Sequence, residues 1–162
     1  MRQVISAPQH IDVAPFALRL AGGSTVITDP ARSLCASYGY QTLYEIPVAL
    51  QKALLRELIR GHAESLRMRP DGVWDHSVFF WLADWMRWLW GATPAEEWEA
   101  VLAEARPAAE ACEVIHHVAQ GPRAAYDGYR WLDERNGAQV ERLMRALYRD
   151  LGCESRVREA RA

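Results

Sequence analysis

Five histidines are the side chains of this sequence best suited to binding a metal ion or transferring a proton: His10, His62, His76, His116 and His117. His62, His76 and either His116 or His117 fall on three different predicted helices. Inward-facing His and carboxylate side chains of a helical bundle can bind a divalent ion, and Asp75 or Glu113 would supply a carboxylate. The spacing is not specific for such a site, because Asp75-His76 also fits the start of a helix. A metal-dependent helical-bundle enzyme is therefore an alternative hypothesis.

The known sequence motifs of catalysis are incomplete in this chain. His62-Ala63-Glu64 has the H-x-E spacing of zinc deaminases, but the P-C-x-x-C segment that completes their metal site is absent. There is no H-E-x-x-H pair. Ser24 and Ser33 lack the G-x-S-x-G context of a hydrolase nucleophile, and residues 22–25 (GGST) are too short for a phosphate-binding loop. We therefore predict no catalytic residue, no metal ligand and no cofactor, and we favour a non-enzymatic protein.

A tryptophan-rich segment suggests how such a protein would act. Trp81, Trp85, Trp88 and Trp90 fall within ten residues, on a predicted helix whose apolar arc covers about 200°, twice what an ordinary surface helix needs. A central helix wrapped by its neighbours would explain this excess. The alternative is that part of the arc contacts another chain, because Trp and Phe are enriched in interface hot spots. The residues at the margins of the arc are the candidates for that interaction: Phe79, Trp88 and Trp90.

A stripe of arginines on the last predicted helix could bind a different kind of partner, a nucleic acid. Arg142, Arg145 and Arg149 recur at intervals of three and four residues, so they share one helix face that could contact phosphates. Nearby aromatic residues could stack on bases: Tyr126, Tyr129, Trp131 and Tyr148. The same pattern is typical of a solvated helix face beside core aromatics. Because the net charge of the chain is −2, nucleic-acid binding is an unlikely alternative.

The amino-acid composition indicates a source and a cellular compartment for the protein. The basic residues are 18 Arg and a single Lys, Lys52, which is typical of a GC-rich coding bias and suggests a bacterium or its phage. Three widely spaced cysteines, Cys35, Cys112 and Cys153, argue against a disulfide framework. The N-terminus has no signal-peptide core, and the most apolar stretch, residues 78–90, is too short and too charged to span a bilayer. We expect a cytoplasmic protein.

The hydrophobic pattern predicts a mainly α-helical fold in one domain over residues 1–162. Residues 1–46 should contain a β-hairpin, with strands at 16–21 and 24–28 around Gly22-Gly23 and a further strand at Val4-Ile5. Residues 47–152 should form a bundle of about five helices. The expected helices are 47–68, 76–90, 94–104, a fourth beyond Pro107 to about 119, a short one at 123–133, and 138–151. The tail, 153–162, should be frayed.

These features together predict a protein–protein interaction module. A small inhibitor, immunity or regulatory protein of a bacterium or phage would fit, with the tryptophan-rich helix binding another protein or a second copy of the chain. No membrane partner is expected. This function is inferred from the general class of protein, since no motif of the sequence specifies a function.

Overall fold

Five short strands form one parallel sheet in the computed structural model, which describes residues 1–125 and 133–162. The strands are β1 Arg2–Ser6, β2 Val26–Ile27, β3 Gly72–Trp74, β4 Val114–Gln120 and β5 Val157–Arg161. Their order across the sheet is β2-β3-β1-β4-β5, so β1 lies at the centre and pairs with β3 on one side and β4 on the other. Because every pair is parallel, the carboxyl ends of all five strands lie at the same edge.

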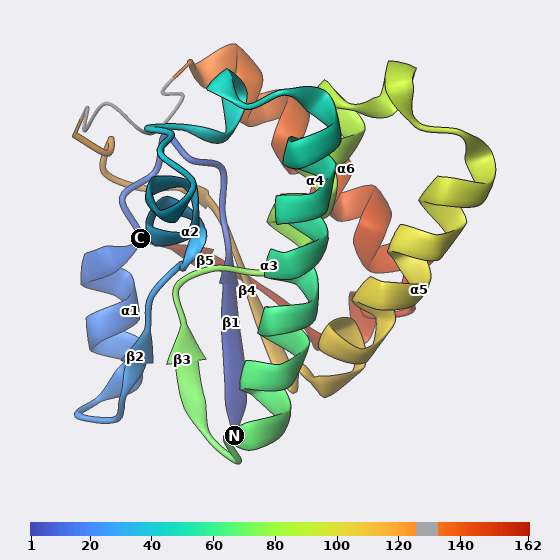
Figure 1. The fold of residues 1–162 in the computed structure, drawn as a ribbon. Coiled ribbons are helices and arrows are strands. Elements are labelled where there is room, and N and C mark those ends of the chain that lie inside the picture. Colours follow the sequence, from blue (N-terminus) through green and yellow to red (C-terminus); the bar gives the residue numbers. More distant parts are fainter. Residues whose placement is uncertain (126–132) are drawn as a thin grey trace.

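Within the described residues, six α-helices and three single 3₁₀ turns connect these strands. The helices are α1 Ala14–Ala21, α2 Ala31–Ser37, α3 Val48–Met68, α4 Val78–Trp88, α5 Ala95–Ala111 and α6 Glu134–Asp150. The turns are η1 Leu43–Glu45, η2 Trp90–Ala92 and η3 Glu154–Arg156. Helices α3 to α6 cover one face of the sheet, while α1 packs on the other (Figure 1). The molecule is therefore a three-layer α/β structure with unequal helical layers.

The alternation of side chains along the strands divides the core between these two layers. Val4 and Trp74 point into the larger core beneath α3 to α6, and the next residue of β1, Ile5, points into the smaller core beneath α1. Successive strand residues face opposite sides of a sheet. A parallel sheet covered on both faces therefore needs apolar residues at consecutive positions, as in Val4-Ile5 and Val73-Trp74.

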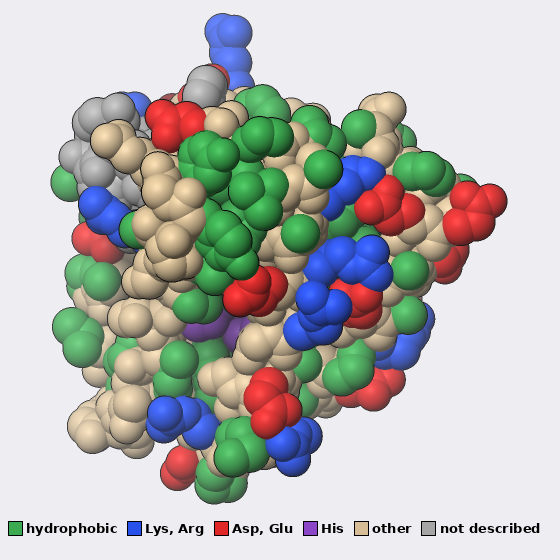
Figure 2. Space-filling model, viewed as in Figure 1, with side chains coloured by type: hydrophobic (Ala, Val, Ile, Leu, Met, Phe, Trp, Pro, Cys, Tyr) green, Lys and Arg blue, Asp and Glu red, His purple; other side chains and the backbone are tan. Residues whose placement is uncertain are grey.

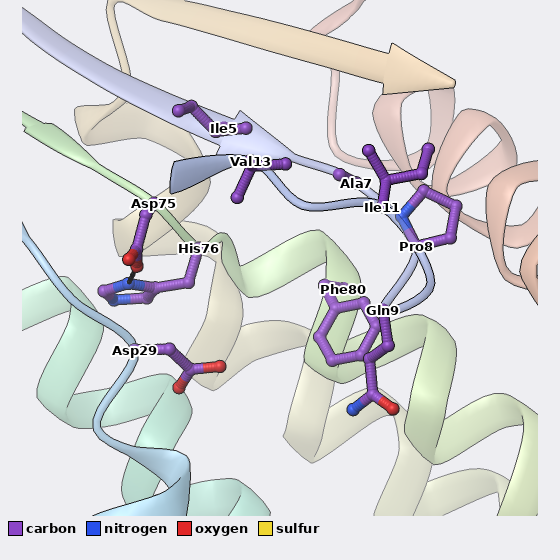
Figure 3. Close-up of a pocket in the computed structure, with 10 residues that line it drawn as sticks. All are labelled: Ile5, Ala7, Pro8, Gln9, Ile11, Val13, Asp29, Asp75, His76 and Phe80. Atoms are coloured by element: carbon purple, nitrogen blue, oxygen red, sulfur yellow. Dashed lines mark hydrogen bonds and ion pairs between the residues drawn. The ribbon is translucent and has the colours of Figure 1, made fainter. Parts of the chain in front are cut away.

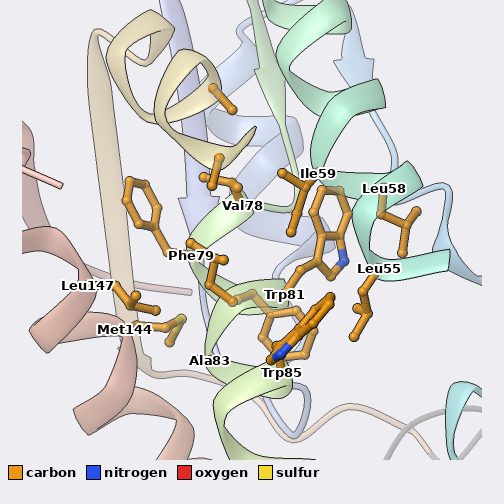
Figure 4. Close-up of a cluster of buried hydrophobic side chains, with 14 of the residues drawn as sticks. Leu55, Leu58, Ile59, Val78, Phe79, Trp81, Ala83, Trp85, Met144 and Leu147 are labelled. Carbon is orange, nitrogen blue, oxygen red and sulfur yellow. The ribbon is translucent and has the colours of Figure 1, made fainter. Parts of the chain in front are cut away.

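Helix α4 lies in the middle of the larger layer (Figure 4). Phe79, Trp81 and Trp85 are completely buried there, between side chains of α3 such as Ile59 and side chains of α6 such as Met144. A helix with neighbours on two sides and a sheet beneath it has to be apolar around most of its circumference. This arrangement accounts for most of the wide apolar arc.

The prediction of a helical bundle with an N-terminal β-hairpin is wrong, because the structure is α/β with a five-stranded parallel sheet. Residues 16–21, expected to be the first hairpin strand, belong to α1. Gly22, with φ 54°, caps the carboxyl end of that helix, and its N–H donates to the carbonyl of Leu18. A glycine after an apolar run marks a helix end as readily as a hairpin turn, because both require a left-handed residue.

Strands form in three segments where the sequence predicted none. Residues 114–120, expected to continue a helix, form β4, and residues 157–161, expected to be frayed, form β5 beside it. Parallel pairing satisfies the backbone of this charged tail, so it is ordered without an apolar run of its own. Gly72–Trp74, predicted to lie at and just beyond a turn, is β3, which pairs with β1 and β2.

The predicted helices at 47–68, 76–90 and 138–151 are confirmed in outline as α3, α4 and α6. By contrast, α5 continues through Pro107, where a break was expected. Pro107 and Ala103, whose carbonyl loses its helical donor, are both exposed, so water can hydrate that carbonyl. Most of the short helix predicted at 123–133 lies outside the described residues. Within the described ranges, no helix is long and apolar enough to cross a membrane.

Candidate functional site

A small cavity lies at the carboxyl edge of the sheet, where the segments after β1, β2 and β3 meet (Figure 3). Its volume is about 90 Å³, and we call it the edge cavity. It is lined by Ile5, Ala7, Pro8, Gln9, Ile11, Val13, Asp29, Asp75, His76 and Phe80. In open parallel sheets, ligands bind outside the carboxyl ends of the strands, because the connecting segments there leave a crevice. The position of the cavity therefore makes it the leading candidate site.

Two aspartates enter this cavity from neighbouring strands. Ile27 of β2 and Trp74 of β3 are paired, and Asp29 and Asp75 follow them by two residues and one residue. Each aspartate is held by the backbone. The Asp29 carboxylate accepts a hydrogen bond of 2.8 Å from the N–H of Ala31, and the N–H of Asp75 donates one of 3.0 Å to the carbonyl of Ile27. Strand pairing thus fixes the two carboxylates at one side of the cavity.

His76 completes this polar side of the cavity, with its Nδ1 3.1 Å from Oδ1 of Asp75. A carboxylate next to one ring nitrogen favours the tautomer that carries its proton on that nitrogen. His76 is then left with Nε2 as the atom that can accept a proton. Figure 3 shows Asp29, Asp75 and His76 on one side, with Pro8, Gln9 and Phe80 across from them. The cavity therefore has one acidic, proton-accepting side and one largely apolar side.

A second histidine lies directly behind His76. The ring centroids of His62, on α3, and His76 are 4.8 Å apart, and both rings pack against the indole of Trp81. His62 is buried, and neither of its ring nitrogens has a hydrogen-bond partner among the described residues. Burial first, and the neighbouring His76 second, hold the pKa of His62 well below its usual value of 6.5. Figure 2 shows histidine side chains at the bottom of a hollow in this face of the molecule.

The structure brings together only two of the histidines proposed as metal ligands. His62 and His76 converge, whereas His116 and His117 lie on β4. His116 contacts Phe16 beneath α1, and the Nδ1 of His117 lies 2.8 Å from the hydroxyl of Tyr148 in the opposite layer. Across residues 1–125 and 133–162, no three His, Cys, Asp or Glu side chains are placed to hold a metal ion together. The predicted three-histidine constellation is thus not assembled.

A second, smaller cavity adjoins the first and shares Gln9 and Phe80 with it. Its acidic group is Asp84 of α4, which is 3% exposed, and we call it the Asp84 cavity. Oδ2 of Asp84 lies 3.3 Å from the hydroxyl oxygen of Tyr44, whose ring packs against Trp88. Burial is the main cause that raises the pKa of Asp84 to about 7, against the lowering effect of the hydrogen bond from Tyr44. This carboxyl therefore changes charge near neutral pH.

The three residues predicted to form an interaction surface are placed differently. Phe79 is completely buried in the core, where its ring packs edge-on against Tyr148 with centroids 4.9 Å apart, so it cannot meet a partner. Trp88 and Trp90 are exposed by 40% and 51% of their surfaces. Trp88 lies beside Tyr44 at the Asp84 cavity, and Trp90 packs against Trp98 of α5. The two exposed indoles thus remain available on the surface.

The arginine stripe of α6 is partly neutralised by carboxylates. Arg145 binds Glu159 of β5 through both terminal nitrogens, at 2.7 and 3.1 Å, and also contacts Glu141 one helical turn away. Arg142 and Arg149 are exposed. Of the aromatic residues proposed to stack on bases, Tyr148 is buried in the core. Tyr126, Tyr129 and Trp131 lie outside the described residues.

Four residues of the two cavities were missed as functional candidates in the sequence: Gln9, Asp29, Tyr44 and Asp84. A usable signal existed for Asp29, because it directly follows a short β-prone run, as Asp75 does. Recognising that signal requires the strands to be identified as parallel first, since only then do their carboxyl ends share one edge.

No protein-family model matches the chain, and no curated protein or solved structure matches it.

Proposed function

We propose that this protein binds a small molecule in the edge cavity, and that the molecule has a positively charged or hydrogen-bond-donating end and an apolar body. The observation that carries this proposal is the convergence of Asp29 and Asp75 from two paired parallel strands, with His76 held against Asp75. Ionised carboxylates only accept hydrogen bonds, so they favour amines, amidines or hydroxyl groups and disfavour anions.

The rest of the cavity wall supports the apolar half of the ligand. Ile11 and Phe80 are buried residues that line the cavity across from the acidic side. A flat apolar group placed against Phe80 would bury carbon surface at about 25 cal/mol per Å². Small-molecule sites typically combine such apolar walls with a few convergent polar groups.

The pairing of Asp75 with His76 also supports proton transfer from the bound molecule. The carboxylate orients the imidazole, and Nε2 is the nitrogen that remains for a ligand placed within hydrogen-bond distance. A binding protein and an enzyme of acid–base chemistry would both use this arrangement. Binding requires only the arrangement of these side chains, whereas a catalytic role depends on the chemistry of the ligand.

Isothermal titration calorimetry with three probes of similar shape tests the proposal: benzamidine, benzamide and benzoate. We expect measurable binding of the benzamidine cation at pH 7.5, weaker binding of benzamide and none of benzoate. Asp75→Asn should weaken benzamidine binding at least tenfold, because it removes one of two facing charges. Asp71→Asn, at an exposed position of the turn before β3, is the matched control and should leave binding unchanged. Equal binding of benzoate and benzamidine would overturn the proposal.

A second candidate function is protein–protein interaction through Trp88 and Trp90, with another protein or a second copy of the chain as the partner. The exposure of these two large aromatic side chains near each other on α4 and η2 supports it. A small inhibitor, immunity or regulatory protein of a bacterium or phage would act this way. The cytoplasmic location expected from the sequence stays a prediction.

Sedimentation velocity and partner capture test this second candidate. Replacing Trp88 and Trp90 together by Ala should reduce self-association or abolish capture of a partner. The matched control is Leu18→Ala on α1, where a side chain exposed by 67% lies on another element. If the double variant keeps its fold and changes neither assembly nor capture, the interaction hypothesis is wrong.

A further inference from the structure

Gln9 lies between the edge cavity and the Asp84 cavity and lines both of them. Its Oε1 is 3.3 Å from the hydroxyl oxygen of Tyr44, and the same hydroxyl oxygen is 3.3 Å from Oδ2 of Asp84. The phenol thus joins the side chain of Gln9 to a buried carboxyl group.

The number of protons available to Gln9, Tyr44 and Asp84 limits which hydrogen bonds these three side chains can form. A phenol carries one proton, so the Tyr44 hydroxyl can donate either to Gln9 or to Asp84 and never to both. Tyr44 itself stays protonated, because burial and the neighbouring Asp84 raise its pKa well above the usual value. The second contact must therefore have its own donor, which is either a protonated Asp84 or the amide NH₂ of Gln9.

Two arrangements satisfy this requirement. If Asp84 is protonated, its O–H donates to Tyr44, and Tyr44 donates to Oε1 of Gln9, which is the amide orientation in the structure. If Asp84 is ionised, Tyr44 donates to the carboxylate. The amide of Gln9 then has to rotate by half a turn, so that its NH₂ donates to Tyr44 and its Oε1 takes the place of the NH₂ group.

We propose that Gln9 is a specificity-determining residue of the edge cavity, and that protonation of Asp84 sets the orientation of its amide through Tyr44. With Asp84 protonated, Gln9 presents its NH₂ donor on the side away from Tyr44. With Asp84 ionised, it presents an oxygen acceptor at that position instead. This inference rests on the proposed function, because it names which ligand groups the edge cavity prefers at each pH.

The surroundings of Asp84 determine that its carboxyl group loses its proton near neutral pH. Burial is the largest influence and raises the pKa of Asp84. Tyr44, Arg87 and Trp88 lower it, and Asp29 adds a smaller raising effect, so that the pKa comes to about 7. Helix α6 faces the same cavity with three residues that carry no charge: Asn136, Gly137 and Val140. Arg87 also packs over the ring of Trp88, with its guanidinium carbon 4.6 Å from the ring centroid. Asp84 is thus the group of the Asp84 cavity whose charge changes in this range.

A ligand-free measurement tests the inference directly. The side-chain NH₂ resonances of Gln9, assigned by their loss in Gln9→Ala, are followed by ¹H–¹⁵N NMR from pH 5.5 to 8.5. We expect one transition in the wild-type protein, none in Asp84→Asn, and none in Tyr44→Phe, which keeps the carboxyl but breaks the link. His76→Gln should keep the transition, because that histidine is outside the chain of hydrogen bonds. A flat wild-type titration, or a full transition in Asp84→Asn or Tyr44→Phe, would refute the inference.

The binding of benzamidine provides the second readout. Because the amidine has only donors, its affinity in the His76→Gln background should rise by about threefold to tenfold between pH 6 and 8, the range that one net hydrogen bond supplies. Adding Gln9→Met should remove most of this rise and leave the smaller effect of the Asp84 charge. If the full rise persists with Met at this position, Gln9 does not determine specificity. If benzamidine does not bind at all, the proposed function fails, and the NMR titration still decides whether Asp84 sets the orientation of the Gln9 amide.

Discussion

The imidazole of His62 lies directly behind that of His76, with ring centroids 4.8 Å apart, although the two residues come from different elements. His76 reaches the edge cavity, whereas His62, on α3, is buried against Trp81 of α4. A charged imidazole without hydrogen-bond partners in such a place would be strongly unfavourable. His62 is therefore neutral in the folded protein near neutral pH.

This neutrality predicts how stability depends on pH. The pKa of His62 is lowered on folding, so the unfolded chain binds a proton at a pH where the folded chain does not. The free energy of unfolding therefore falls as pH drops below about 6.5. Urea unfolding of the wild-type protein at pH 7.5 and 5.0 should reveal this loss. His62→Leu should remove up to about 2 kcal/mol of the difference between the two pH values, because the unfolded histidine gains its proton over this range. The control His116→Gln changes a half-buried histidine outside the site and should have a smaller effect.

The long amphipathic helices of this fold could be predicted from the sequence, but its sheet could not. Helix α3 repeats its apolar residues at helical spacing over 21 residues, which makes the pattern unambiguous. Strands β2 and β3 have two and three residues, too few for a pattern of period two. Their stability comes from pairing with segments far away in the chain, which no local pattern records.

The candidate site was invisible in the sequence for the same reason. Asp29 and Asp75 are separated by the whole of α3, and only the pairing of Ile27 with Trp74 places them side by side. The convergence of His62 with His76 was one of several combinations that five histidines allow. No motif of the sequence marks Asp84, and only the structure shows its carboxyl buried against Tyr44.

Asp84 predicts a pH effect of opposite sign to that of His62. Its pKa is raised to about 7 from 3.8, so the folded chain binds a proton more tightly than the unfolded chain. The stability from this group is present below pH 4 and is lost as pH rises to about 7. Asp84→Asn keeps the shape of the side chain without the charge. The variant should therefore lack the loss of stability that the wild-type protein shows between pH 5 and pH 8, which is up to about 3 kcal/mol, in thermal or urea unfolding.

The opposite result for Asp84→Asn would be informative. If the variant loses stability equally at pH 5 and pH 8, the ionised carboxylate does not destabilise the folded protein. The hydrogen bond from Tyr44 then stabilises the carboxylate by more than its burial costs. Tyr44→Phe is the matched comparison, because it removes that hydrogen bond and leaves the carboxyl in place.

The three cysteines should be unreactive in the folded protein. Cys35, Cys112 and Cys153 form no disulfide within the described residues and are at most 1% exposed, and burial raises the pKa of Cys112 to about 12. The thiolate is the reactive form, so both access and ionisation are prevented. Ellman's reagent at pH 8 should label no thiol until denaturant is added and three thiols afterwards. Ser24→Cys, at an exposed position, is the control that should react at once.

Gly72 links the stability of the sheet to the geometry of the edge cavity. It adopts φ 142°, and a Cβ atom placed there would lie 2.9 Å from Cδ1 of Ile27 and 3.3 Å from the indole of Trp74. These are the paired residues that precede Asp29 and Asp75. Gly72→Ala should therefore cost about 1–3 kcal/mol in urea unfolding and also weaken benzamidine binding, because the strands that position both carboxylates must move apart.

Gly91→Ala is the matched control for this substitution, because Gly91 has no positive φ and no atom within 4 Å of the added carbon. It should leave both stability and binding nearly unchanged. If Gly72→Ala destabilises the protein but binds benzamidine as the wild type does, the two aspartates are held by their own backbone hydrogen bonds rather than by the register of β2 and β3. If it changes neither property, the close approach of Ile27 to Gly72 is relieved without cost, and the packing of β2 on β3 is looser than these distances imply.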